Sequence, residues 1–299
     1  MPFGRWLEDL RHEALAKGVG APILDRALRG LKPIARVIEL DRKQPEFTMT
    51  FRQYLTRVVP AARVATGKRK LNENRALLET VAKKYGVQAR FLVAFWGIET
   101  DFGRLTGGFS VVRALATLAH DGRRSSYFRK ELINALKILD GGHIELSAMT
   151  GSWAGAMGQP QFMPSSFLAY AVDDNGDGRK DIWTTKADVF ASAANYLARS
   201  GWKGDETWGR RVSLPEGLDQ ALASLKVRKR LSAWQDLGVR RIDGSDLPTR
   251  DLQASVVYPG KPGGDAYIVY NNFRTILKWN RSTYFAVAVG SLADRIGGG

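Results

Sequence analysis

The segment FLVAFWGIETDFGR, residues 91–104, places one carboxylate at the end of an apolar run. Residues 91–98 are all apolar or glycine, and Glu99 follows them directly. A glutamate is rarely fully buried without a partner, and removal of the carboxyl group from water disfavours its charged form. We therefore expect Glu99 to have a raised pKa and to act as the proton donor in cleavage of a glycosidic bond. The alternative is a glutamate at a helix end that points to solvent or pairs with Arg104.

A second carboxylate is what most glycosidases place across the scissile bond. Asp101 is the nearest candidate, but residues i and i+2 of a helix do not share a face. No other carboxylate close to Glu99 in the sequence is convincingly placed. A single acid indicates that the substrate itself supplies the second reacting group.

Outward from this segment the chain is mainly helical in pattern. Helices are predicted over residues 5–85, 125–140, 188–200 and 275–296. After residue 205 the helical period weakens, and short strands are predicted at 252–258 and 267–271 around the turn-rich segment PGKPGGD. The predicted class is mainly α (α+β), with a small β subdomain.

A glycine-rich segment, GSWAGAMGQPQFMPSS, occupies residues 151–166. Its small residues, together with Trp153 and Phe162, predict a tight turn beside a groove in which aromatic and amide side chains hold sugar rings. A phosphate loop is the competing reading, but the GK[ST] signature is missing and no strand clearly precedes the segment. A purely structural packing segment is the other alternative.

An acidic loop, DDNGDGRKDIWT, occupies residues 173–184 and has the spacing of an EF-hand calcium loop. The predicted oxygen ligands are Asp173, Asn175, Asp177, the Arg179 carbonyl and Asp181, with Asp188 in place of the usual final glutamate, where the sequence has Thr184. We expect a structural Ca²⁺ or Na⁺ here. An Asx-rich turn without metal is the alternative, and an empty loop remains open.

Charge and cysteine content narrow the class further. Lys and Arg total 45 against 30 Asp and Glu, a net charge of +15, which suits an anionic polymer as partner. The chain has no cysteine, so disulfides and thiolate metal sites are excluded. Residues 1–10 show no apolar signal-peptide core, and the apolar runs are too short to span a bilayer.

Six segments, taken in order, resemble the membrane-bound lytic murein transglycosylase B family of bacteria. They are GIETDFG (97–103), ALATLAHDGRR (114–124), GSWAGAMGQPQFMPSSF (151–167), DDNGDGRKDIW (173–183), SAANYLARSGW (192–202) and NRSTYFAVAVG (280–290). The resemblance covers nearly the whole chain. It implies a lysozyme-like helical catalytic core at residues 86–205, a helical region at 1–85 packed with a C-terminal helix at 274–299, and a small β subdomain at 206–273.

The same resemblance implies a peptidoglycan lytic transglycosylase. Such an enzyme cleaves the β-1,4 bond between N-acetylmuramic acid and N-acetylglucosamine, and the muramic 6-hydroxyl attacks in place of water to give a 1,6-anhydro end. Glu99 matches the family's single acid/base, and the acidic loop matches its metal loop. Matched to substrate-binding positions are Ser152, Gln161, Phe162, Met163, Tyr196, Asn280 and Tyr284. Gln159-Pro160 departs from the family pattern and is expected to alter the groove wall rather than the chemistry.

The expected partners are peptidoglycan glycan strands, with a cell-wall or membrane association but no nucleic acid. No organic cofactor is expected, and we expect a periplasmic monomer. Two other functions stay open: a muramidase on the same fold that uses water, and a non-catalytic basic protein that binds the wall or nucleic acid. The second is disfavoured because the sequence has no helix-turn-helix, zinc-finger or RNA-binding signature.

Overall fold

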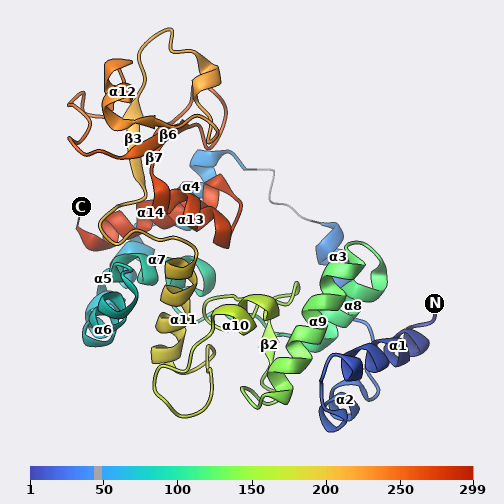
Figure 1. Cartoon of the computed structure of the whole chain (residues 1–299). Helices are drawn as coiled ribbons and strands as arrows, with labels where there is room; N and C mark the ends of the chain where they lie inside the picture. Colours follow the sequence, from blue (N-terminus) through green and yellow to red (C-terminus); the bar gives the residue numbers. More distant parts are fainter. Residues whose placement is uncertain (44–48, 299) are drawn as a thin grey trace. The chain divides into compact units, whose positions relative to one another are not determined.

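The computed structural model of the chain describes residues 1–43 and 49–298 (Figure 1). The described residues form 14 α-helices and seven short strands, so the predicted mainly α class with a small β part is confirmed. The chain divides into two compact units, Met1–Phe47 with Glu99–Asn195, and Thr48–Ile98 with Tyr196–Gly299. The three-part division expected from the sequence stays a prediction, and the two units are described separately below.

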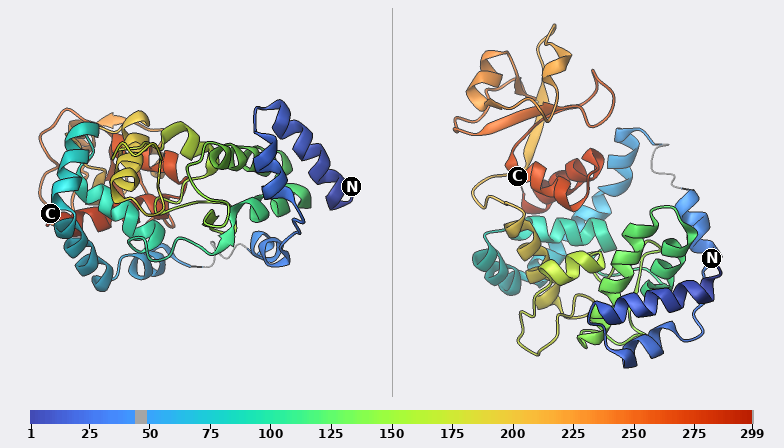
Figure 2. Two further views of the ribbon diagram at one scale, coloured as in Figure 1. Left: turned by 90° about the horizontal axis from the view of Figure 1, so that it is seen from below. Right: turned by 45° about the vertical axis from the view of Figure 1, so that its right-hand side comes forward.

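The first unit is built around a helical hairpin of α8 (Val111–Asp121) and α9 (Ser125–Asp140), which lie side by side (Figures 1 and 2). Gly122 ends α8 in the left-handed conformation, where glycine carries no steric penalty. The apolar faces of both helices are buried, because their large residues repeat at the helical period. The predicted helix from Ser125 is confirmed.

Three N-terminal helices cover this hairpin. They are α1 (Phe3–Ala16), α2 (Ala21–Leu28) and α3 (Ala35–Arg42), with α2 packed on α9 and α3 on α8. Asp41 in α3 is buried and pairs with Arg124 at 2.6 Å and with Arg123 at 3.4 Å, at the turn between α8 and α9. Paired in this way, the buried carboxylate fixes the end of α3.

The remaining elements of the first unit follow the hairpin in sequence. Strands β1 (Phe109–Ser110) and β2 (Thr150–Gly151) pair antiparallel, and α10 (Pro164–Tyr170) packs on α9. The buried carboxylate of Glu131 in α9 accepts a 2.8 Å hydrogen bond from the backbone N–H of Ser165, which attaches the start of α10. Helix α11 (Lys186–Arg199) confirms the helix predicted at 188–200 and runs into the second unit after Asn195.

The second unit contains most of the other helices. They are α4 (Phe51–Val58), α5 (Ala61–Glu73), α6 (Arg75–Tyr85), α13 (Asn271–Trp279), α14 (Thr283–Gly297) and the larger part of α7 (Ala89–Thr100). Helix α14 packs against α4, α5 and α13. A Cβ on Gly290 of α14 would lie 2.2 Å from the Trp208 ring, so only glycine allows this contact. The indole N–H of Trp208 donates to Asp294 at 2.8 Å, which secures the ring on α14.

The small β subdomain is an antiparallel sheet with strand order β4-β6-β7-β3-β5. Its strands are β3 (Gly209–Ser213), β4 (Lys229–Arg230), β5 (Arg240–Arg241), β6 (Gln253–Val257) and β7 (Ala266–Val269). The pairing of β6 with β7 confirms the predicted hairpin. One face of the sheet packs on α12 (Leu231–Asp236) around the buried Trp234, and the indole N–H of Trp234 donates to Ala254 O at 3.0 Å.

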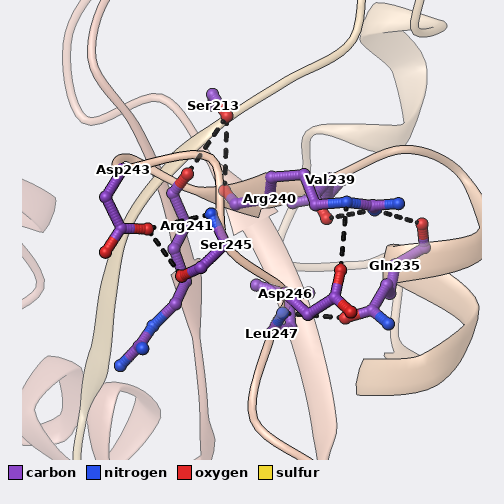
Figure 3. Close-up of polar contacts among 9 residues, drawn as sticks. All are labelled: Ser213, Gln235, Val239, Arg240, Arg241, Asp243, Ser245, Asp246 and Leu247. Carbon is purple, nitrogen blue, oxygen red and sulfur yellow. Dashed lines mark hydrogen bonds and ion pairs between the residues drawn. The ribbon is translucent and has the colours of Figure 1, made fainter.

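A polar cluster holds the edge strand β5 in place (Figure 3). The Arg240 guanidinium donates to the carbonyls of Gln235 and Val239 and lies 3.3 Å from Asp246. Gln235 Oε1 accepts a 2.7 Å hydrogen bond from the backbone N–H of Leu247. The cluster therefore connects α12, β5 and the loop that follows.

Across residues 1–43 and 49–298, none of the helices combines the length and the apolar content needed to cross a bilayer.

Candidate active site

Glu99 lies in the last turn of α7 and is half-buried. The next residue, Thr100, is 1% exposed, and its hydroxyl donates a 2.9 Å hydrogen bond to Gln159 O. The same hydroxyl accepts a 3.1 Å hydrogen bond from the backbone N–H of Gly103. Thr100 thus attaches the end of the helix, and with it Glu99, to the glycine-rich segment.

The helix ends in an unusual turn directly after this threonine. Asp101, Phe102 and Gly103 have φ of 50°, 61° and 84°, three successive residues in the left-handed region. For the two that are not glycine this conformation is sparsely populated and costs on the order of 1–3 kcal/mol each. Such strain persists only where the surroundings fix it, and it is concentrated in functional sites.

Asp101, the other nearby carboxylate, is bound by Arg104. Arg104 Nη2 and Nε lie 2.7 and 2.9 Å from Asp101 Oδ2. The arginine next to the site therefore pairs with Asp101, which gives this aspartate a structural partner within its own turn.

The glycine-rich segment folds into a tight double turn. Met157 forms bridges with both Gly151 and Phe162. A Cβ on Gly151 would lie 2.1 Å from Ala156 O. Gly158 has φ 67°, and a Cβ there would lie 2.7 Å from Ile182. The glycines are therefore required by the close approach of the backbone, and the structural reading of the segment accounts for them.

The predicted polar groove residues of this segment also stabilise its turns. Ser152 Oγ accepts a 3.0 Å hydrogen bond from the Ala156 N–H. Gln161 has φ 52°, and its amide nitrogen donates to Gly158 O at 2.9 Å and to Thr106 O at 3.1 Å. Both side chains are half-buried. These hydrogen bonds hold both side chains in place within the segment.

Phe162 and Met163, the two apolar residues predicted beside them, differ in exposure. Phe162 is 2% exposed and belongs to the core, so its side chain is not available at the surface to contact a ligand. Met163 is half-buried and immediately precedes α10.

Three more predicted substrate-binding residues belong to the second unit. The Tyr196 hydroxyl donates to Lys278 O at 2.8 Å, and its ring contacts Trp279 edge-on at 4.8 Å between centroids. Asn280 is exposed and directly follows α13, and its Oδ1 accepts a hydrogen bond from the Ser282 N–H. The structure thus brings Tyr196 to the end of α13 where Asn280 lies.

Tyr284 has a different setting from these two. Its ring packs on Phe51 and Tyr54 of α4, with centroids 5.3 and 5.5 Å apart. These contacts give it a packing role between α14 and α4.

Gln159 is a central residue whose role the sequence did not reveal. It is 8% exposed, its N–H donates to Ile182 O at 2.9 Å, and its side-chain amide donates to Trp183 O at 2.7 Å. Its carbonyl accepts the Thr100 hydroxyl. Gln159 therefore joins the end of α7 to the end of the acidic loop. In the sequence, the one indication that this position is unusual was that Gln159-Pro160 departs from the family pattern.

The acidic loop is organised by its own carboxylates. Asp173 accepts hydrogen bonds from the backbone N–H groups of Gly176, Asp177 and Gly178 at 2.7, 3.2 and 2.8 Å. Asp188 is 0% exposed and accepts from the N–H groups of Asp174 and Asp181 at 2.8 and 2.7 Å. Burial, with the charge of Asp173 as a smaller cause, raises the pKa of Asp188.

The rest of the loop carries the other predicted ligands. Asp177 Oδ1 accepts a hydrogen bond from the Arg179 N–H. The side-chain amide of Asn175 donates to Asp177 Oδ2, and Asn175 Oδ1 accepts from the Asp177 backbone N–H. Asp181 accepts from the backbone N–H groups of Trp183 and Thr184 just before α11. Burial acts to raise the pKa of Asp181, but the hydrogen bonds from Thr184 and its neighbours prevail and lower it.

The donor chemistry of this loop suits a hard cation, because every predicted ligand is an oxygen. In the part of the chain that the structure describes, however, no three Asp, Glu, His or Cys side chains are arranged to hold a metal ion by themselves. A cation in the loop would therefore also need the Asn175 amide, the Arg179 carbonyl and water as ligands.

Comparison with known proteins relates this geometry to a family. The model of the transglycosylase SLT domain matches residues 2–294. The chain is 33% identical over 238 residues to the membrane-bound lytic murein transglycosylase B of Escherichia coli (strain K12). That alignment covers 75% of this chain but only 61% of the relative, less than two thirds of its length.

Solved structures agree along almost the whole chain. SltB3 from Pseudomonas aeruginosa, in complex with NAG-anhNAM-pentapeptide, is 45% identical with a TM-score of 0.97 over 100% of this chain and 80% of that chain. SltB1 from the same organism is 30% identical with a TM-score of 0.86, over 98% of each chain. Slt35 from Escherichia coli, in complex with calcium, is 29% identical with a TM-score of 0.83, over 97% of this chain and 92% of that chain.

Proposed function

Because this chain belongs to the family of proteins with a transglycosylase SLT domain, we propose that it is a lytic transglycosylase acting on peptidoglycan. It cleaves the β-1,4 bond between N-acetylmuramic acid and N-acetylglucosamine and leaves a 1,6-anhydro end. The observation that carries the proposal is the position of Glu99, half-buried at the end of a helix that Thr100 and Gln159 hold in place. The match of SltB3 with a bound anhydro-muropeptide supports the same substrate class.

The proposed mechanism uses one carboxyl group twice. The protonated Glu99 carboxyl donates its proton to the glycosidic oxygen while the bond from that oxygen to the muramic C1 breaks. Positive charge then develops on C1 and its ring oxygen. The Glu99 carboxylate removes the proton from the muramic 6-hydroxyl as that oxygen bonds to C1, which closes the anhydro ring and restores the acid. No water is consumed, so no second carboxylate is needed to activate one.

The neighbouring groups support this division of roles. Asp101 is bound by Arg104 within its own turn, which favours a structural role for it. Glycan binding is proposed for Ser152, Gln161, Met163, Tyr196 and Asn280, with Phe162 supporting the groove from the core and Tyr284 from its packing on α4. Trp153, half-buried and beside Ser152, is a further candidate to stack on a sugar ring.

Replacement of the proposed acid tests the mechanism. Glu99→Gln keeps the size of the side chain and removes its titratable proton, so we expect an intact fold and a loss of turnover of about 10²–10⁴-fold or more. The measurement is the release of soluble muropeptides from purified murein, with far-UV circular dichroism to check folding. Asp101→Asn is the matched control, because it makes the same chemical change two residues away and should retain most activity. Full turnover in Glu99→Gln would eliminate the proposed role.

A structural cation is proposed for the acidic loop, with Asp173, Asn175, Asp177, the Arg179 carbonyl, Asp181 and Asp188 as the candidate ligands. The calcium complex of the related Slt35 supports Ca²⁺. The cation would stabilise the loop and, through Gln159, the end of α7, without taking part in the reaction. We further propose that the enzyme acts as a monomer on glycan strands in the periplasm, associates with the cell wall or membrane, and uses no organic cofactor. The net charge of +15 suits an anionic wall polymer.

A further inference from the structure

Arg274, on α13 in the second unit, is a half-buried cation held by neutral oxygens. Its Nη2 donates hydrogen bonds to Leu225 O at 2.6 Å and to Ser255 Oγ at 2.7 Å. Ser255 is 0% exposed, and its own hydroxyl donates to Val227 O at 2.6 Å. These bonds fix the guanidinium between α13, strand β6 and the loop that precedes β4.

Arg228 brings a second positive charge to the same place. Strand β4 pairs with β6 so that Lys229 faces Ala254 and Arg230 faces Gln253. Continued by one residue, this register sets Arg228 opposite Ser255, and cross-strand partners share one face of a sheet. Arg228 is exposed. Burial, and after it the charge of Arg228, lower the pKa of the Arg274 guanidinium.

Neither cation has an acidic partner among residues 1–43 and 49–298. Three other arginines of the β subdomain do have one: Arg240 lies 3.3 Å from Asp246 (Figure 3), Arg250 lies 2.9 Å from Asp205, and Arg230 lies 3.7 Å from Asp251. Two neighbouring positive charges repel each other, and an anion between them removes that cost. The pair is therefore chemically suited to bind an anionic group from outside the chain.

We propose that Arg228 and Arg274 form a subsite for a carboxylate group of the peptide stem carried by the glycan strand. The proposal rests on the proposed function, which makes stem-bearing peptidoglycan the substrate. A guanidinium matches the two oxygens of a carboxylate in geometry as well as charge. Strand β4 is at the edge of its sheet, and Gln253 on the same face is exposed, so an extended peptide has backbone and amide groups to bond with. Among the relatives, SltB3 has been seen with a glycan that carries a pentapeptide.

The test compares substrates with and without stems. Cleavage by the full chain is measured on murein strands that carry peptide stems and on strands from which an amidase has removed them. In Arg228→Gln, the ratio of kcat/KM on stem-bearing strands to kcat/KM on stem-free strands is expected to fall about tenfold. Lys229→Gln is the matched control, because it removes the same charge from the opposite face of β4. Its ratio is expected to stay within about twofold of the wild-type value.

Three results would contradict the subsite. The ratio could be unchanged in Arg228→Gln, or it could fall equally in Lys229→Gln, which would indicate a general effect of charge. Direct calorimetry could also show that Arg228→Gln loses affinity for inorganic phosphate but not for a soluble disaccharide pentapeptide, which would assign the pair to a phosphate-bearing polymer. A wild-type chain that cleaves neither substrate would instead refute the proposed function, so the two failures are distinguishable.

Discussion

At the scale of single residues, the buried hydroxyl of Thr100 holds the backbone next to Glu99. It donates to Gln159 O and accepts from the Gly103 N–H, so it stabilises the strained turn at Asp101 and Phe102. A general acid must be placed within hydrogen-bond distance of the atom it protonates, and small displacements of the backbone remove that contact. Thr100 is thus a positioning residue for the proposed acid.

Thr100→Val should separate stability from catalysis. The variant leaves Gln159 O and the Gly103 N–H without their partner, which costs about 1–3 kcal/mol of unfolding free energy, and we expect kcat per folded molecule to fall at least tenfold. Thr117→Val is the matched control, because Thr117 is also buried and also accepts from a backbone N–H, that of Ile34, and donates to a carbonyl, that of Arg113. Urea unfolding and murein turnover measure the two effects. A similar fall in kcat for Thr100→Val and Thr117→Val would contradict a positioning role for Thr100.

Individual residues were predictable to different degrees. Glu99 could be singled out from the sequence because a carboxylate at the end of an apolar run is chemically conspicuous. The left-handed turn at Asp101 and Phe102 could not be predicted, because nothing in those residue types requires a positive φ. The hydrogen bonds of Gln159 could not be predicted either, because they join segments that are distant in the sequence.

At the scale of elements, the acidic loop and the helix that follows it act together. Asp188 in the first turn of α11 accepts N–H groups from both ends of the loop, and Asp181 accepts from the residues that lead into α11. The EF-hand spacing predicts a metal-binding loop, which stays a prediction, and the structure shows that the loop is built around its carboxylates. The spacing could not show that these carboxylates also serve the loop's own backbone N–H groups.

Removal of calcium should destabilise this loop. A ligand that binds only the folded state at 100 times its Kd adds about 2.7 kcal/mol, so excess chelator should lower Tm by several degrees relative to calcium-saturated protein. Asp173→Asn provides the control and should show a much smaller calcium-dependent shift. An identical Tm with calcium and with chelator would argue that the loop binds no calcium.

The joint between α4 and the β subdomain predicts a pH dependence. A hydrogen bond from Arg52, helped by the charge of Arg211, lowers the pKa of Asp265 below its ordinary value. A lowered folded-state pKa stabilises the protein above the unfolded value of about 3.9, and this stability is lost as pH falls through the folded pKa. Asp265→Asn should therefore lower the free energy of unfolding by about 1 kcal/mol or less at pH 7, because both arginines are solvent-exposed. At a pH below the folded-state pKa, the substitution should have no effect.

Urea unfolding from pH 7 down to pH 2 measures this difference between wild type and variant. Asp251→Asn, which removes the same charge from an exposed side chain 3.7 Å from Arg230, is the control and should have little effect at any pH. A loss in Asp265→Asn that persists unchanged at the acid end would assign it to packing rather than to charge.

Elements with many residues in one pattern were predicted best. The helix from Ser125 and the strands of the β6–β7 hairpin follow clear periods and are confirmed. The predicted helical stretch at residues 5–85 consists of several short helices, because breaks such as Gly18 and Pro60 interrupt it. Strands β4 and β5 have only two residues each, too few to show alternation.

At the scale of the whole molecule, the chain order does not follow the compact units. Each unit combines two separate stretches, and two of the three boundaries between the units fall inside α7 and α11, where helical periodicity continues without interruption. Composition cannot reveal these two boundaries, because each lies within a continuous helix. The mainly α class, in contrast, followed from the proportion of helical patterns and is confirmed.

Product mass spectrometry tests the central proposal most directly. The protein is incubated with purified murein sacculi, and the masses of the released muropeptides are measured. Attack by the muramic 6-hydroxyl predicts products lighter by one water than those of a hydrolytic muramidase treated in parallel, and none of them in Glu99→Gln. Products with the hydrated mass would contradict the account, because water would then be the nucleophile and a second group would have to activate it.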